Sequence, residues 1–212
     1  MTGMLGNGFL VSFQIFALTL LGSLPLGMLV AFARMSRFKP LALLARFYIS
    51  IMRGTPLMLQ MFAIYFMPYY VFGINLTTDS KWQATIVAFI VNYAAYFAEI
   101  FRGGLQSIPR GQREAGKALG FSRVQIFFRI LLPQLFKRSL LPVSNEVVTL
   151  VKDTALVTCI ALCDMYYYAK KATSATGSLL PLFLAGAFYL LMNTVVEVVF
   201  DRLNKRMDYY RG

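Results

Sequence analysis

Four charged side chains in the second half of the chain lie within or beside long apolar stretches: Glu146, Lys152, Asp153 and Asp164. An unpaired charge inside a lipid bilayer costs several kcal/mol, so such groups should face a bundle interior or water. Their chemistry would be electrostatic, and they could bind each other or a polar solute. For the adjacent Lys152 and Asp153, a structural ion pair is the favoured interpretation.

The sequence has no comparable set of residues that could catalyse a covalent reaction. The sequence has no histidine, and its two cysteines, Cys159 and Cys163, are one helical turn apart in an apolar setting typical of packed thiols. No nucleophile has an evident base, and no glycine-rich phosphate loop of the Walker type is present. We therefore predict that this chain has no catalytic or metal site and binds no cofactor itself.

A second polar region interrupts the apolar sequence between residues 103 and 129. On a helical wheel its charged and apolar residues separate, with Arg110, Arg113, Glu114 and Lys117 on one side and Ala115, Ala118 and Leu119 on the other. This pattern predicts a short amphipathic helix at a membrane surface. Gly120 is the expected C-terminal cap of that helix, and Ser122 with Gln125 forms a capping pair that starts the next one.

The composition indicates which solvent surrounds these polar residues. A 212-residue chain that is 58% hydrophobic and 14% charged cannot bury its apolar surface in one soluble core. A polytopic all-α membrane protein is the predicted class. The net charge of +12 would suggest nucleic acid in a soluble protein, but here the basic residues cluster between apolar spans, so we predict no nucleic-acid partner.

Five apolar segments are long enough to cross a bilayer: residues 8–33, 43–72, 82–102, 130–162 and 178–201. They predict one transmembrane domain over residues 1–212, with its core at about 8–205.

Several residues should interrupt or end these segments. Thr55 followed by Pro56 has the form of an N-cap and first helical residue, which predicts that a helix restarts there. Pro133 and Pro142 predict bends with a structural or gating role. The tyrosines at 166–168 are expected to form an aromatic belt and loop on the outer side.

The basic residues predict the orientation. Only four of the 21 lysines and arginines lie away from the segments assigned to the inner side: Lys81, Lys152, Lys170 and Lys171. Because basic residues are enriched on the cytoplasmic side, we predict five crossings with the N-terminus outside and the C-terminus in the cytoplasm.

The inner polar region resembles a known family motif. Glu114-Ala115-Gly116, three residues, Gly120, nine residues, Ile130, one residue and Leu132-Pro133 is similar to the EAA loop of ABC-importer permeases. Gly116 is the one departure, since the family most often has a second alanine there. The stretches 53–57, 95–104 and 152–156 resemble signatures of the polar amino-acid branch of the type I importers.

This resemblance implies a mechanism and partners. Such permeases pair with a second permease, identical or homologous, and an ATP-binding subunit dimer holds ATP and Mg²⁺. A binding protein outside the cell delivers the amino acid, and the complex sits in the cytoplasmic membrane of a prokaryote. The coupling residues would be Glu114, Ala115, Gly116 and Gly120, with Arg110, Arg113 and Lys117 offering charge to the ATPase. The family layout also suggests a substrate path lined by Asp164, Thr55, Gln60, Asn92 and Glu146, in which Asp164 contacts an ammonium or cationic side chain.

Other functions remain open from the sequence. A permease of the same type could carry another small polar solute, such as an opine, a betaine or a peptide. From other classes, a passive channel or a membrane-embedded enzyme would share the apolar composition, although the missing catalytic residues argue against the enzyme.

Overall fold

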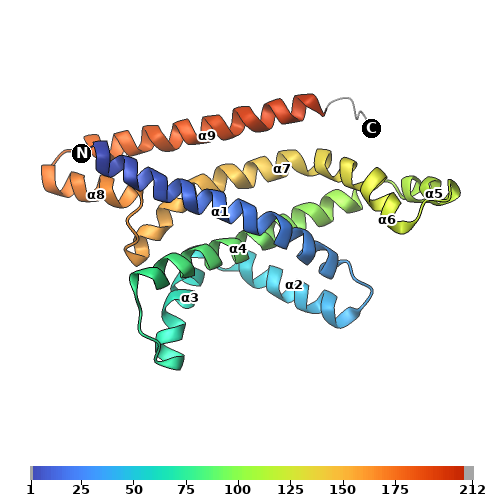
Figure 1. The fold of residues 1–212 in the computed structure, drawn as a ribbon, viewed down its shortest axis with the longest axis horizontal. Coiled ribbons are helices and arrows are strands. Elements are labelled where there is room, and N and C mark those ends of the chain that lie inside the picture. The colour runs from blue at the N-terminus through green and yellow to red at the C-terminus, as the bar shows by residue number, and fades with distance from the viewer. Residues whose placement is uncertain (1, 208–212) are drawn as a thin grey trace.

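The computed structural model describes residues 2–207 and is helical wherever regular structure is present (Figure 1). The elements in chain order are α1 Thr2–Arg34, α2 Lys39–Gly54, α3 Leu57–Phe72, α4 Thr78–Gln106, α5 Arg110–Ala118, α6 Arg123–Ile126, the π-helix η1 Phe127–Leu131, α7 Leu132–Asp153, the 3₁₀-helix η2 Thr154–Ile160, α8 Met165–Thr176 and α9 Leu180–Arg206. The predicted all-helical class is therefore confirmed.

Helix α4 lies at the centre of the core, and α1 packs along it (Figure 1). The contact face of α1 carries small side chains, including the buried Thr19 and Ser23. A Cβ atom at Gly27 would lie 2.8 Å from the Phe97 Cβ and 3.0 Å from the Ala94 carbonyl oxygen. Small residues thus let the two backbones approach closely, as is common between membrane helices.

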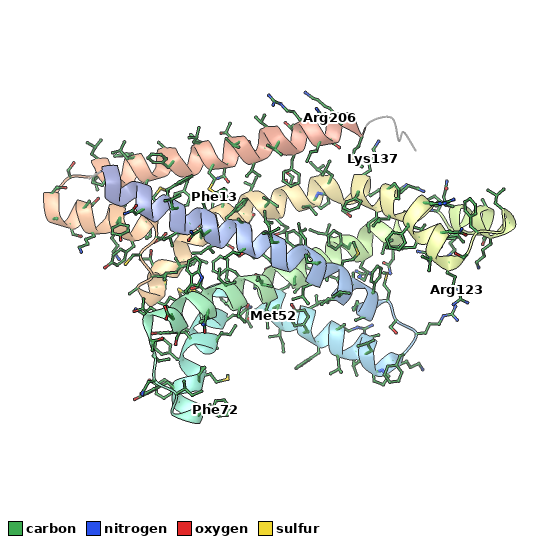
Figure 2. All side chains as sticks on the ribbon, viewed as in Figure 1. Phe13, Met52, Phe72, Arg123, Lys137 and Arg206 are labelled. Atoms are coloured by element: carbon green, nitrogen blue, oxygen red, sulfur yellow. The ribbon has the colours of Figure 1, made fainter. Side chains whose placement is uncertain are left out.

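Helices α2 and α3 are separated at Thr55 and Pro56, where the sequence predicted a restart, but the predicted cap was wrong: Pro56 and not Thr55 is the N-cap of α3, and Thr55 ends α2. Thr55 is extended, at φ −124° and ψ 147°, which is the conformation that a following proline favours. The Thr55 hydroxyl donates to the Ile51 carbonyl oxygen at 2.8 Å. The chain leaves α2 here and restarts as α3, whose far end at Phe72 projects away from the bundle (Figure 2).

The end of α5 and the start of α6 have the caps that the sequence predicted. Gly120 is left-handed at φ +76°, and the Phe121 amide donates to the Gly116 carbonyl oxygen at 3.0 Å. Ser122 and Gln125 form a capping box, because each side chain accepts from the backbone amide of the other. The turn between the two helices is thereby fixed.

The two prolines predicted to bend the chain, Pro133 and Pro142, occupy different positions in α7. Pro133 lies in the first turn of α7, directly after the π-helical segment η1, whereas Pro142 lies inside α7, which continues through it. A π-helical turn is a rare element that is frequent at functional sites.

The expectation for the tyrosines at 166–168 was wrong. The tyrosines at 166–168 are not in a loop but in the first turn of α8. The Asp164 side chain caps this helix by accepting from the Tyr166 and Tyr167 amides. The physical reason is that Asp is a strong N-cap residue, and this signal outweighs the loop tendency of the lysine-containing stretch.

Three described helices are long and apolar enough to cross a membrane, namely 6–34, 78–106 and 180–206, and α3 is a shorter apolar helix. Helices α1, α4, α7 and α9 run lengthwise, with α8 near one end of the molecule and α5 and α6 near the other (Figure 1). The basic side chains of Arg123 and Arg206 lie toward the end that carries α5 and α6 (Figure 2).

Candidate coupling site and polar path

The charged face of α5 is open to solvent. Arg110, Arg113, Glu114 and Lys117 are all exposed, so the structure places the four predicted coupling charges on the outside of one short helix. Ala115 is exposed as well. Because α5 projects from the end of the helical bundle, another protein could contact this face without displacing any described part of the chain (Figure 1).

Gly116 is the buried residue of α5 and sets how closely this helix packs on the next element. A Cβ atom there would lie 2.9 Å from the Ile130 Cδ1 and 3.0 Å from the Ile126 Cγ1. The place where the sequence departs from the EAA pattern is therefore the contact between α5 and the segment that leads into α7. A displacement of α5 would be passed to η1 through this contact.

Exposed apolar side chains flank this charged face, and sequence reasoning did not single them out as a site. Leu119 is 73% exposed, Val124 64% and Phe128 60%. Apolar residues that remain exposed beside a charged helix are typical of a protein interface. Their signal in the sequence was their apolar character within a region that is otherwise strongly basic.

Three of the five predicted path residues form one hydrogen-bonded network at the break between α2 and α3. Gln60 Nε2 donates to the Thr55 hydroxyl at 2.8 Å, and Asn92 Nδ2 donates to Gln60 Oε1 at 2.9 Å. Both amides also donate to the Met52 carbonyl oxygen, each at 3.0 Å. Met52 lies where α2 approaches α4 (Figure 2). The network satisfies backbone groups freed by the helix break.

Asp164 belongs to a separate network near α8. Its carboxylate is fully buried and accepts four hydrogen bonds. The donors are the Thr158 hydroxyl at 2.7 Å, the Tyr167 amide at 2.9 Å, the Tyr166 amide at 3.2 Å and the Tyr189 hydroxyl at 3.4 Å. These bonds join η2, α8 and α9, so the structure places Asp164 in a different hydrogen-bond network from Thr55, Gln60 and Asn92.

The predicted ion pair between Lys152 and Asp153 is wrong, because no salt bridge joins them in the described part of the chain and Asp153 instead bonds a residue of another helix. The Tyr93 hydroxyl of α4 donates to Asp153 Oδ2 at 2.7 Å, and the neighbouring Lys152 is exposed. This bond joins α4 to α7 across 60 residues of sequence. Glu146 lies on α7 two turns earlier and is half-buried.

Glu99 forms ion pairs that link α1 to α4. Arg102 donates to Glu99 Oε2 from Nη2 at 2.6 Å and from Nε at 2.9 Å, and the Nε of Arg34 lies 4.0 Å from Glu99 Oε1. The three-residue spacing of Glu99 and Arg102 was visible in the sequence, but the contribution of Arg34 depends on how α1 packs.

Comparisons with known proteins give this geometry a context. The sequence model of the family described as "Binding-protein-dependent transport system inner membrane component" matches residues 23–209. The arginine transport system permease protein ArtQ of Bacillus subtilis is 35% identical over 202 residues, which is 95% of this chain and 91% of the relative. The L-cystine transport system permease protein TcyB of the same species is 32% identical over 97% of this chain and 87% of the relative.

A third relative and two solved structures extend the comparison. The octopine transport system permease protein OccM of Rhizobium radiobacter is 41% identical over 85% of this chain and 78% of the relative. An amino acid ABC transporter solved with histidines matches with a TM-score of 0.86 and 29% identity, covering 97% of this chain and 94% of that one. An inward-facing structure of the MetNI methionine ABC transporter shares the fold, with a TM-score of 0.75 at 18% identity over 98% and 95% of the two chains.

Proposed function

The chain belongs to the family of binding-protein-dependent transport system inner membrane components, and we propose that it is the permease subunit of an ATP-driven importer of a polar amino acid. The observation that carries this proposal is the match of the family model over residues 23–209, which includes α5 with its exposed charged face. In this family the permease is the translocating subunit, and a separate subunit hydrolyses ATP.

The proposed topology has five crossings within one domain spanning residues 1–212. The N-terminus lies outside and the C-terminus in the cytoplasm of a prokaryotic cell, with the chain in the cytoplasmic membrane. The distribution of basic residues supports this orientation. It would put α5 and α6 on the cytoplasmic side and α8 on the outer side.

The proposed partners follow from the two ends of the molecule. On the cytoplasmic side α5 would dock on a dimer of ATP-binding subunits, which hold ATP and Mg²⁺. Glu114 would face basic groups of the partner, and Arg110, Arg113 and Lys117 would meet its acidic groups. On the outer side a binding protein would release the amino acid, which crosses between this permease and a second one within the bilayer.

The proposed path through the membrane uses the polar residues of two helix breaks. Thr55, Gln60 and Asn92 would line it near the break after α2, Glu146 would face it from α7, and Asp164 would meet the substrate near the outer end. Pro133 and Pro142 would serve alternating access as structural or gating residues. Lys152 and Asp153 would have a structural role in α7, where Asp153 accepts a hydrogen bond from the Tyr93 hydroxyl of α4.

The test is reconstitution with the ATPase subunits and the binding protein in lipid vesicles. L-Arginine, L-cystine and L-glutamine are supplied one at a time, together with octopine because one relative is named for that opine. We expect one of the amino acids to stimulate ATP hydrolysis and to accumulate inside the vesicles only with ATP. Equilibration of the solute through the permease without ATPase subunits would instead indicate a passive channel.

A further inference from the structure

A cavity of about 350 Å³ lies at the end of the molecule that carries α5 and α6. Its lining comes from the ends of α1 and α4 and from α5, α6 and η1. This volume falls within the range of small-molecule sites, which is about 300–1,000 Å³. The lining includes none of the proposed path residues, so the cavity is separate from the two polar networks described above.

Most of the cavity lining is apolar. The apolar residues are Phe32, Met35, Leu105, Ile126, Phe127 and Leu131. Leu105, Ile126 and Leu131 are buried, whereas Phe32 is 39% exposed. The rings of Phe32 and Phe127 meet edge to face, with their centroids 5.4 Å apart, and so join α1 to η1. The apolar lining therefore continues from an exposed ring to buried side chains, and this surface is suited to a hydrocarbon chain.

Three basic side chains line the same cavity, and none of its lining residues is acidic. Arg113 and Lys117 are four residues apart on α5, which places them on one face, and Arg123 is the first residue of α6. All three are exposed. Within the described residues 2–207, every ion pair involves Glu99 and another arginine, so none of the three is paired with a carboxylate. The cavity thus presents unpaired positive charge beside apolar surface.

The cavity lies at the level where two membrane-spanning helices end. Met35 directly follows the apolar span 6–34, and Leu105 is the last residue but one of the span 78–106. On the proposed topology this level is the cytoplasmic surface of the bilayer. Anionic phospholipids of that leaflet attract lysine and arginine, and basic pockets between transmembrane helices on this side bind their head groups.

One of the three basic residues distinguishes the cavity from the coupling face of α5. Arg113 and Lys117 line the cavity but are also proposed to meet the ATPase. Arg123 lines the cavity and is not one of the proposed coupling residues. It directly follows Ser122, the N-cap of α6, and its side chain extends outward at this end of the molecule (Figure 2). Substitution of Arg123 therefore tests the cavity apart from ATPase docking.

We propose that this cavity binds an anionic phospholipid of the cytoplasmic leaflet, with the headgroup phosphate on Arg113, Lys117 and Arg123 and an acyl chain against Phe32 and Phe127. Phosphate oxygens accept charge-assisted hydrogen bonds from guanidinium and ammonium groups. The acyl chain would cover the apolar lining, which an acidic protein surface would leave exposed to water. The bound lipid would connect α5 and α6 to the ends of α1 and α4. This assignment rests on the proposed function only for the side of the membrane.

The test uses the purified complex of permease and ATPase subunits in nanodiscs of phosphatidylcholine. The nanodiscs contain a trace of phosphatidylglycerol with a photoreactive diazirine in its acyl chain, and mass spectrometry maps the labelled positions after illumination. We expect labelling beside Phe32 and Phe127 that decreases as the mole fraction of unlabelled phosphatidylglycerol rises. Arg123→Gln should weaken the apparent affinity for phosphatidylglycerol about 5-fold, and Arg123→Lys should retain most of it.

Matched controls separate headgroup recognition from general effects of charge and of apolar surface. Arg202→Gln removes an exposed arginine of α9 that does not line the cavity, and it should be labelled like the wild type. A phosphatidylcholine with the same diazirine should label these positions weakly. Equal labelling by both lipids would overturn the proposal, because it would indicate contact with acyl chains alone. An equal loss in Arg202→Gln and Arg123→Gln would overturn it as well, since it would indicate an effect of net charge.

A soluble anion is distinguished from a lipid by adding glycerol phosphate or inorganic phosphate to the buffer. We expect neither to displace the labelled lipid. Displacement by either anion, or the absence of labelling beside Phe32 and Phe127, would overturn the lipid assignment.

ATP-driven uptake is measured on the same wild-type complex in vesicles that contain phosphatidylglycerol. Uptake of an amino acid without selective labelling would leave the importer function standing and reject only the lipid site. Selective labelling without uptake of any amino acid would support the lipid site and reject the proposed importer function.

Discussion

Asp164 has a structural role at the residue scale that its sequence context did not reveal. Its two carboxylate oxygens each accept two hydrogen bonds, and together these bonds join η2, α8 and α9. A buried carboxylate with four donors is well satisfied without a ligand. A test of its proposed contact with substrate must therefore distinguish the role of Asp164 as the helix cap from the role of its negative charge.

Two substitutions at Asp164 provide that separation. Asp164→Ala should lower the free energy of unfolding by about 1–3 kcal/mol, because the α8 cap is lost and buried donors are left unpaired. Asp164→Asn keeps one accepting oxygen but replaces the other by an NH2 group that cannot accept, so we expect it to be destabilised less than Asp164→Ala. If Asp164 meets a cationic group of the substrate, Asp164→Asn should still lose most ATP-driven uptake. Full uptake by Asp164→Asn would limit this residue to its structural role.

Gly116 gives a second prediction at the same scale. Gly116→Leu would press a side chain into Ile126 and Ile130, so we expect the melting temperature to fall, with a cost of about 1–3 kcal/mol. ATP hydrolysis should then respond less to substrate, because the contact between α5 and η1 is changed.

The matched control is Gly111→Leu in the same helix, since a Cβ atom at Gly111 would meet no heavy atom within 4 Å. This variant should fold as well as the wild type or slightly better, because leucine favours a helix more than glycine does. Equal destabilisation by both substitutions would show that packing at Gly116 is not the cause.

At the scale of the element, α5 is a short helix whose charged side chains are exposed to solvent. A nine-residue helix is marginal by itself, so its form depends on the left-handed Gly120 that follows it and on the packing of the buried Gly116. Its exposed charges contribute little to its own stability. They are available to a partner.

Reversal of the Glu114 charge tests that interpretation. Glu114→Lys should abolish ATP-coupled uptake and weaken co-purification of the ATPase subunits, while the unfolding temperature stays near that of the wild type because the side chain is exposed. Gln112→Lys adds a lysine two residues earlier on another side of the helix and should leave uptake intact. Coupled uptake that persists in Glu114→Lys would contradict a docking role.

At the scale of the whole molecule, the lengthwise helices and the basic residues predict one orientation. Alkaline phosphatase fused after Thr78 should be active, because the end of α3 and the start of α4 would lie outside. A cytoplasmic reporter such as green fluorescent protein should be fluorescent at the C-terminus. The expected contrast would disappear with a different number of crossings, and an extracellular signal from the C-terminal fusion would refute the proposed topology.

Local sequence signals determined much of this protein. The left-handed Gly120 and the Ser122–Gln125 box each depend on residues within one turn of each other, so spacing alone predicted them. It also predicted the position of the helix restart at Thr55 and Pro56, although not which residue caps it. Composition likewise determined the membrane environment, because it depends on the amount of apolar surface and not on its arrangement.

The tertiary structure decided which polar residues meet. Asn92 and Gln60 are 32 residues apart, and Tyr93 and Asp153 are 60 apart, so their hydrogen bonds exist only after α4 packs against α3 and α7. The same packing joined Asp164 to Tyr189 of α9 and brought Arg53 over Tyr96. Pairing between distant residues depends on the relative placement of whole helices, and no local spacing records that placement.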